Sequence, residues 1–184
     1  DDIGITLNLP GQHNILNALA AIAIASDEGI YSEDIEKVLE NFKGVGRRFE
    51  VDGRFSVGDG SFLLVDDYGH HPREVAVTIE AVRNGWPGDR LVMVYQPHRY
   101  TRTFEMFDQF VEVLAGVDHL ILTQVYSAGE DEIPGATRRD LFDELVAERH
   151  VKIDFVEHIK DIPSLLDTVV QVGVLVLTQG AGET

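Results

Sequence analysis

The sequence predicts a doubly wound α/β domain with a mostly parallel sheet, preceded by a short helical segment. Two observations support this prediction. Beyond Pro72 the chain alternates short apolar strands with amphipathic helices, a pattern typical of a parallel sheet that is covered on both faces. Between Gln12 and Phe42 the apolar residues instead recur with helical spacing, and no strand intervenes.

Two helices are expected at the start of the chain. The alanine-rich segment from Gln12 to Asp27 is apolar on nearly all sides, which predicts a helix that is packed on most of its faces. A second helix is expected from Ser32 to Phe42, with the Ser32 hydroxyl as its N-cap. We place the domain boundary near Gly44, Val45 and Gly46, where the helical pattern ends.

The α/β unit is expected to open with a β-hairpin. Its strands are Arg54–Val57 and Phe62–Val65, separated by the turn residues Gly58, Asp59 and Gly60. After the hairpin, helices and strands alternate. The expected helices cover residues 73–84, 103–115, 138–149 and 161–171, and the expected strands cover residues 91–95, 119–123, 152–156 and 174–178.

Polar and aromatic side chains follow the carboxyl ends of the predicted strands, which is the edge where ligands bind in such sheets. The densest group is D-D-Y-G-H-H (66–71), directly after the apolar run Phe62–Val65. The next strand is followed by Q-P-H-R-Y-T-R-T (96–103). Guanidinium forks beside imidazoles suggest an anionic ligand. The alternative is a solvated loop in which Thr101 or Thr103 caps a helix.

The composition excludes several classes of protein. The 184 residues carry a formal net charge of −17, which argues against nucleic acid as a partner, because phosphate backbones are bound mainly by clustered Lys and Arg. There is no cysteine, so disulfides and thiolate chemistry are excluded. No apolar run approaches the roughly 20 residues that span a bilayer, and the acidic start is unlike a secretory signal. We therefore expect a cytoplasmic protein.

Phosphate and metal motifs are weak or missing. In G-V-G-R-R-F (44–49), Phe49 stands where a dinucleotide fingerprint has its third glycine, and no G-x-x-x-x-G-K-[ST] occurs. A metal-dependent hydrolase is an alternative hypothesis; its ligands would be Asp66, Asp67, His70 and His98. Adjacent loop residues rarely aim at one ion, however, and the spacings of helix-borne zinc motifs are absent. We therefore expect no metal ligands, and we expect Arg138 and Arg139 to balance nearby acidic groups.

Six motifs, in order along almost the whole chain, closely resemble the Mur ligase family. The resemblance is strongest to the branch that joins L-alanine to UDP-N-acetylmuramate, and the nearest alternative is the branch that attaches ready-made murein peptide. The motifs are G-Q-H-N-I-L-N-A-L-A-A (11–21), G-V-G-R-R-F-E (44–50), D-D-Y-G-H-H-P-R-E-V (66–75), Q-P-H-R-Y-T-R-T (96–103), V-Y-S-A-G-E (125–130) with I-P-G (133–135), and Q-G-A-G (179–182).

The resemblance implies that residues 45–184 form the Rossmann-like C-terminal, amino-acid-binding domain, and that residues 1–44 are the helical tail of the central ATPase domain. In that family a UDP-sugar-binding domain and a P-loop domain complete the enzyme, and the P-loop domain holds most of the contacts to ATP and Mg²⁺. The implied partners are ATP, L-alanine, UDP-N-acetylmuramate and those two domains. Without the P-loop, we expect this chain alone to be inactive.

The resemblance also implies roles for individual residues. The sugar's lactyl carboxylate is phosphorylated by ATP and then attacked by the alanine amine. Asn14 and Asn17 would face the adenine, Arg48 the phosphates or ribose, and Asp67 the ribose hydroxyls. The alanine and acyl-phosphate end would be formed by Tyr68, His70, Arg99 and Arg102, with His98 in support. A non-catalytic nucleotide-binding or docking module is the alternative from another class.

Overall fold

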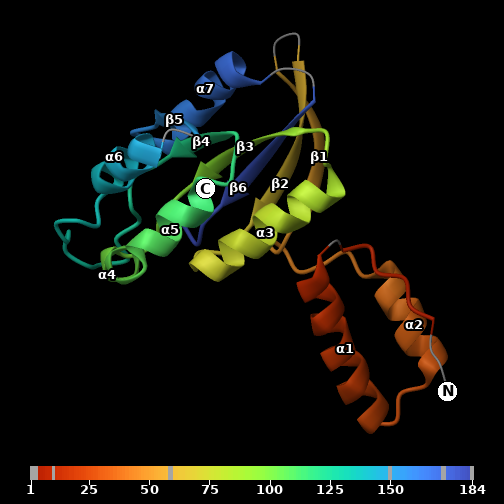
Figure 1. Cartoon of the computed structure of the whole chain (residues 1–184). Coiled ribbons are helices and arrows are strands. Elements are labelled where there is room, and N and C mark those ends of the chain that lie inside the picture. Colours follow the sequence, from red (N-terminus) through yellow and green to blue (C-terminus); the bar gives the residue numbers. More distant parts are fainter. Residues whose placement is uncertain (1–3, 10, 58–59, 149–150, 171–172, 183–184) are drawn as a thin grey trace.

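The computed structural model describes residues 4–9, 11–57, 60–148, 151–170 and 173–182. These residues form a six-stranded sheet with the strand order β1-β2-β6-β3-β4-β5 (Figure 1). The pair β1–β2 is antiparallel, and the other four neighbouring pairs are parallel. The strands are β1 (Glu50–Val57), β2 (Gly60–Asp67), β3 (Arg90–Tyr95), β4 (His119–Leu122), β5 (Lys152–Phe155) and β6 (Val174–Gln179). The predicted α/β class with a mostly parallel sheet is confirmed.

Helices cover both faces of this sheet. One face packs against α3, α5 and α6, through buried residues such as Val75, Phe110 and Leu141, and the other face packs against α7 through Ile162 and Leu166. The helices are α1 (Gln12–Asp27), α2 (Ser32–Asn41), α3 (Pro72–Gly85), α4 (Tyr100–Glu105), α5 (Phe107–Leu114), α6 (Arg138–Glu148), the 3₁₀ helix η1 (Ile159–Asp161) and α7 (Ile162–Val169). None of the described helices is long and apolar enough to cross a membrane.

The apolar strands β3 and β6 form the centre of the sheet. From Leu91 to Tyr95 and from Val174 to Leu177 every residue is at most 1% exposed, and burying each such side chain contributes about 1.5–3 kcal/mol. The hairpin is longer than predicted, because β1 and β2 also pair through Glu50 and Asp66. Its turn residues 58–59 lie outside the described part of the chain.

Two helix predictions need correction. The helix expected at 103–115 is divided at Met106, whose φ of −120° is not helical. In α4 the Thr103 hydroxyl donates to the Arg99 carbonyl, and such back-bonding bends helices. Ser32 is not an N-cap: the helix starts one residue earlier than expected, so the extended Tyr31 is the cap and provides no side-chain hydrogen bond.

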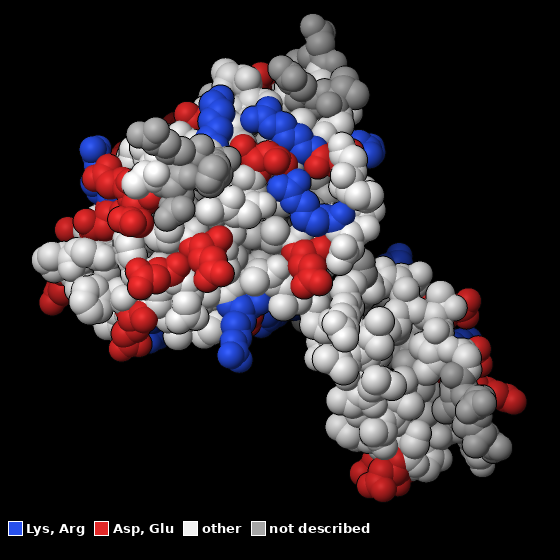
Figure 2. All heavy atoms as spheres, viewed as in Figure 1, with Lys and Arg blue, Asp and Glu red and all other residues white. Residues whose placement is uncertain are grey.

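The helices α1 and α2 pack against each other and project away from the sheet (Figure 1). The prediction that α1 is packed on most sides is wrong. Ala18 is buried in α1, whereas Leu16 and Ile24 are 59% and 66% exposed. In the view of Figure 2 the surface of this helical pair is largely uncharged, while acidic and basic side chains are interspersed over the α/β domain.

Arg47 ties the junction between the helical pair and the sheet to two other parts of the chain. Its Nε lies 3.0 Å from Asp66 Oδ2, and its Nη1 and Nη2 donate to the carbonyls of Gly182 and Gly180 at 2.9 and 3.0 Å. The Arg47 carbonyl accepts from the Tyr68 N–H. Arg47 adopts a left-handed φ of 56°, a conformation that tertiary contacts must hold in a non-glycine residue.

We predict that Arg47→Ala destabilises the chain. The expected loss in the free energy of unfolding is about 1–2 kcal/mol, in the lower part of the range for hydrogen bonds to charged groups, because the Arg47 side chain is 36% exposed. Urea denaturation followed by circular dichroism measures this loss. The control is Arg54→Ala, at an exposed arginine of β1. Equal stability of the two variants would contradict the role given to Arg47.

Candidate functional site

The turn D-D-Y-G-H-H is built around the Asp67 carboxylate at the end of β2. Asp67 is 7% exposed. Its Oδ1 accepts from the Gly69 N–H at 2.8 Å, from the Gln179 side-chain amide at 2.8 Å and from the Thr78 hydroxyl at 3.3 Å. Its Oδ2 accepts from the Phe49 N–H at 3.0 Å. A carboxylate offers about four acceptor positions, so Oδ2 keeps acceptor capacity for a ligand.

The rest of the turn is shaped by a close approach and by a helix cap. A Cβ on Gly69 would lie 2.6 Å from both Asp67 Oδ1 and Gln179 Nε2, so only glycine fits there. The side chain of His71 accepts from the Arg73 N–H, and Glu74 accepts from the N–H groups of His70 and His71, which forms a capping box at the start of α3. One of the two histidines is therefore a helix cap.

The other histidine, His70, belongs to a ring cluster at the carboxyl edge of the sheet. The His70 ring contacts Tyr68 at a centroid distance of 5.4 Å and His98, from the loop after β3, at 5.3 Å. Arg102 of α4 places Nη1 3.2 Å from His98 Nδ1. Four of the residues predicted for the alanine and acyl-phosphate end, Tyr68, His70, His98 and Arg102, are thus in contact, and we refer to them as the ring cluster.

The contact with Arg102 sets the tautomer of His98, and burial is the main cause of its lowered pKa. A guanidinium only donates hydrogen bonds, so Nδ1 of His98 must accept, and the ring proton of the neutral form lies on Nε2. Burial lowers the pKa of His98 below 6.5, and the nearby groups His70, Arg102 and Arg99 lower it further, against the opposing effect of Glu130. His98 is therefore neutral at pH 7, which suits a hydrogen-bond donor or acceptor more than a fixed charge.

Arg99 is oriented differently from the other predicted residues. Its guanidinium lies 3.9 Å from Glu130 and its side chain is half exposed. Among the described interactions, no hydrogen bond or ring contact joins its side chain to the ring cluster, and its charge acts on His98 only by lowering the His98 pKa. The alternative that Thr101 or Thr103 caps a helix is wrong, since α4 begins at Tyr100 with Arg99 as its N-cap residue and has no side-chain cap.

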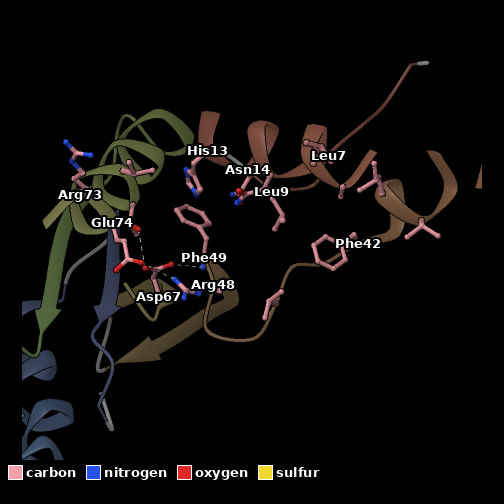
Figure 3. A pocket seen from close by; sticks show the side chains of 18 residues that line it. Leu7, Leu9, His13, Asn14, Phe42, Arg48, Phe49, Asp67, Arg73 and Glu74 are labelled. Atoms are coloured by element: carbon pink, nitrogen blue, oxygen red, sulfur yellow. Dashed lines mark hydrogen bonds and ion pairs between the residues drawn. The ribbon is translucent and has the colours of Figure 1, made fainter. Parts of the chain in front are cut away.

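A pocket of about 780 Å³ lies between the helical pair and the α/β domain (Figure 3). It contains all four residues predicted to bind the nucleotide, Asn14, Asn17, Arg48 and Asp67. Its walls are largely apolar, as in most small-molecule sites. The apolar lining residues are Leu7, Leu9, Ala18, Ala21, Val38, Leu39, Phe42, Val45, Phe49 and Val77.

Several residues of this pocket, notably His13, Phe49, Arg73 and Glu74, were not among the site residues predicted from the sequence. The sequence signal for His13 is its presence in the motif G-Q-H-N, which does not show that its ring faces the pocket. Its Nδ1 is buried and has no hydrogen-bond partner within the described structure, and a heteroaromatic ligand with polar ring atoms would satisfy it. Gly11, at φ 101°, makes room for this ring, because a Cβ there would lie 2.7 Å from His13 Cε1.

Arg48 connects the pocket with the ring cluster. It lines the pocket, its guanidinium lies 5.3 Å from the centre of the Tyr68 ring, and its Nη1 is 3.6 Å from Glu74. Burial of Glu74 opposes ionisation, but the N–H groups of His70 and His71 and the charges of His70 and Arg48 lower its pKa overall. Arg48 therefore borders both the pocket and the ring cluster.

The residues present suit a nucleotide better than a resident metal ion. Apolar walls, two asparagine amides and the unpartnered His13 nitrogen suit a purine. Within the described residues no group of three His, Cys, Asp or Glu side chains is arranged to hold a metal. The hypothesis of a hydrolase with Asp66, Asp67, His70 and His98 as ligands is not supported, because Asp66 is engaged by Arg47 and Thr178, and Asp67 by four donors.

The fold is that of a doubly wound α/β domain, and the candidate site lies at the carboxyl edge of its sheet. Residues 47–182 match the family model described as Mur ligase, glutamate ligase domain. The chain belongs to the Mur ligase family, and the predicted Rossmann-like C-terminal domain is confirmed.

Solved structures share this fold over nearly the whole chain. UDP-N-acetylmuramate-alanine ligase MurC from Thermotoga maritima has a TM-score of 0.77 and 27% identity, with 97% of this chain and 36% of that chain covered. Murein peptide ligase Mpl from Psychrobacter arcticus has a TM-score of 0.65 and 23% identity, with 97% of this chain and 36% of that chain covered. Folylpolyglutamate synthase from Mycobacterium tuberculosis, in complex with ADP and AMPPCP, has a TM-score of 0.68 and 16% identity, with 96% of this chain and 39% of that chain covered. The chain thus spans little more than a third of each of these proteins.

We predict that Asp67→Asn destabilises the chain by about 1–3 kcal/mol, the cost of leaving a buried donor without an acceptor. The asparagine amide has one oxygen and one NH₂ group. Its NH₂ group would face a donor that now bonds to Asp67, and that donor would lose its acceptor. Urea denaturation measures the loss, and Asp131→Asn, at an exposed aspartate, is the matched control. An Asp67→Asn chain as stable as the control would show that the carboxylate is not needed for the turn.

Proposed function

We propose that this chain is the carboxyl-terminal part of a cytoplasmic, ATP-dependent ligase that joins L-alanine to UDP-N-acetylmuramate in peptidoglycan precursor synthesis. The observation that carries the proposal is the position of Arg48, between an apolar, asparagine-containing pocket and a cluster of imidazole, phenol and guanidinium groups. Such a site can hold an elongated anionic ligand with a heteroaromatic end. The resemblance of the motifs and the 27% identity to the Thermotoga maritima enzyme support the choice of substrates.

In this proposal the pocket takes the nucleoside end of ATP. Asn14 and Asn17 face the adenine together with His13, and the ribose hydroxyls use the remaining acceptor capacity of Asp67. Arg48 faces the phosphates, where a guanidinium fork matches phosphate oxygens. Mg²⁺ and most phosphate contacts belong to a P-loop domain, which in this proposal precedes residues 1–44.

The ring cluster serves the amino-acid and acyl-phosphate end. ATP supplies the activation of the sugar's carboxylate, and the residues of this chain orient the groups that then react. Arg102 binds anionic oxygens of the alanine or of the developing tetrahedral centre, where fixed positive charge is most effective. Tyr68 and His70 line the same space, and Arg99 joins them from its exposed position. The chemistry is mainly positioning, so groups from separate domains must come together for reaction.

The first test of this function is phosphate release. The chain alone, with ATP, Mg²⁺, L-alanine and UDP-N-acetylmuramate, is expected to release no phosphate, because it has no glycine-rich loop for the phosphates. A separately expressed fragment with the sugar-binding and P-loop domains is expected to restore weak release that rises with the concentration of both parts. Robust turnover by the 184-residue chain alone, or none with the fragment, would contradict the proposal.

The second test is Arg102→Lys in the complete ligase, meaning the full-length enzyme that contains this sequence. Lysine keeps the charge but loses the planar fork, so kcat/KM for L-alanine should fall at least about tenfold, or roughly 1.4 kcal/mol. Arg139→Lys is the matched control, because Arg139 is exposed and pairs with Asp143. Near-native kinetics for Arg102→Lys would exclude Arg102 from the site.

A further inference from the structure

The loop after β4, here called the Tyr126–Glu130 loop, is joined to the loop that carries His98 and Arg99. Beyond the last residues of β3 and β4, the Tyr126 N–H donates to the Pro97 carbonyl and the Arg99 N–H donates to the Tyr126 carbonyl, both at 2.8 Å. This forms a parallel bridge between His98 and Tyr126. The backbone around His98 is therefore held from the neighbouring strand's loop as well as from its own.

Tyr126 also covers the His98 ring. The two rings stack with an interplanar angle of 16° and a centroid distance of 5.4 Å. His98 contacts His70 and Arg102 as well, so its ring is held between three side chains from three different loops or helices. Tyr126 itself is 44% exposed, so it covers the His98 ring from the surface and not from within the hydrophobic core. The Tyr126 ring therefore restrains His98, which contacts both His70 and Arg102.

Glu130 holds the backbone at the start of α4. It accepts from the Thr101 N–H at 3.0 Å and from the Thr101 hydroxyl at 2.8 Å, and it lies 3.9 Å from the Arg99 guanidinium. Arg99 has a left-handed φ of 70°, which a non-glycine residue keeps only when its surroundings hold it. Glu130 contributes to that restraint alongside the Tyr126 carbonyl, which accepts from the Arg99 N–H, and thereby helps to fix the direction in which Arg99 and Arg102 leave the backbone.

The loop is shaped to present this carboxylate. Ala128 and Gly129 both have positive φ, 51° and 88°, and the Glu130 N–H donates to the Ser127 carbonyl at 3.0 Å. The chain turns sharply there and brings Glu130 back towards α4. A strained turn that delivers one side chain to a backbone N–H in the first turn of α4 is more than a simple connection between elements.

We propose that Tyr126 and Glu130 are positioning residues of the ligase: Tyr126 orients His98 through the ring stack, and Glu130 orients Arg99 and Arg102 through Thr101. The inference rests on the proposed function, in which those three residues face the amino acid and the acyl phosphate. Neither Tyr126 nor Glu130 contacts substrate in this scheme. Their loss acts on the amino-acid end and leaves the nucleotide pocket, which neither residue lines, unchanged.

The kinetic test compares truncated and conservative variants of the complete ligase. Tyr126→Ala and Glu130→Ala are each expected to raise KM for L-alanine about tenfold while KM for ATP stays within about twofold. Tyr126→Phe keeps the stack, and Glu130→Gln keeps an oxygen for the Thr101 N–H and a donor for its hydroxyl, so both should recover most of the loss. Glu144→Ala, at an exposed glutamate of α6, controls for the removal of a carboxylate.

A second readout uses the 184-residue chain and does not depend on activity. The His98 pKa, followed by NMR, should lie below 6.5 in the wild type and rise in Tyr126→Ala, because the ring loses its cover and its fixed contact with Arg102. The charged groups that face His98 and remain in the variant are His70, Arg99, Arg102 and Glu130. Tyr126→Phe should leave the His98 pKa at the wild-type value.

The outcomes separate this inference from the proposed function. The absence of phosphate release with the sugar-binding and P-loop fragment would remove the proposed function and the positioning role with it, whereas near-native Arg102→Lys kinetics would exclude Arg102 from the site and remove the role of Glu130 in orienting it. An impaired Arg102→Lys enzyme beside alanine variants of Tyr126 and Glu130 with unchanged KM for L-alanine would remove the positioning role alone. An unchanged His98 pKa in Tyr126→Ala would also overturn the role of Tyr126. Equal increases in KM for ATP and L-alanine would indicate general damage to the fold and would likewise overturn the inference.

Discussion

The buried carboxylate of Asp67 is the interaction on which the rest of the site depends. Its four hydrogen bonds reach the residue before β1, the turn after β2, helix α3 and strand β6. The Asp67 carboxylate thus holds four segments at one point, one of them from the far end of the chain, directly beside the pocket and the ring cluster. A neutral side chain could not accept from so many donors, which explains why a charged group is kept in a position that is otherwise costly for it.

Much of the fold and part of the site could be predicted because they follow from local pattern. Apolar runs identify β3 and β6, and the carboxyl ends of parallel strands bring Tyr68, His70, His98 and Arg102 together whatever the details of the loops. The break at Met106, the direction of Arg99 and the place of His13 could not be predicted. Arg99 depends on Glu130, from another loop, and His13 depends on how two separate parts of the chain meet. The exposure of α1 was missed for a related reason, since an apolar pattern indicates that a face can be buried and not what buries it.

A chain of strongly acidic composition can still form an arginine-rich site, because each arginine of the site is held in place by its own contacts. Arg47, Arg48 and Arg102 each contact a carboxylate, a carbonyl or an aromatic ring of this chain, and they lie at the carboxyl edge of the sheet. Elsewhere Arg138 and Arg139 pair with Glu157 and Asp143, as expected for charges that balance their neighbours. Local placement, and not net charge, therefore determines which ligand the surface can attract.

Arg47 also limits where the chain could bend between the helical pair and the sheet. Its side chain is fixed to Asp66 and to the loop at 180–182, so any rotation of the helical pair relative to the sheet must occur before it, near Gly44, which has a φ of 98°. The pocket has walls on both sides of that point. A ligand that touches both walls would therefore select one orientation of the helical pair, and its apparent affinity would be lowered by the free energy needed to populate that orientation. Stiffening residues 44–46 in that orientation would therefore tighten binding without adding a single contact to the ligand.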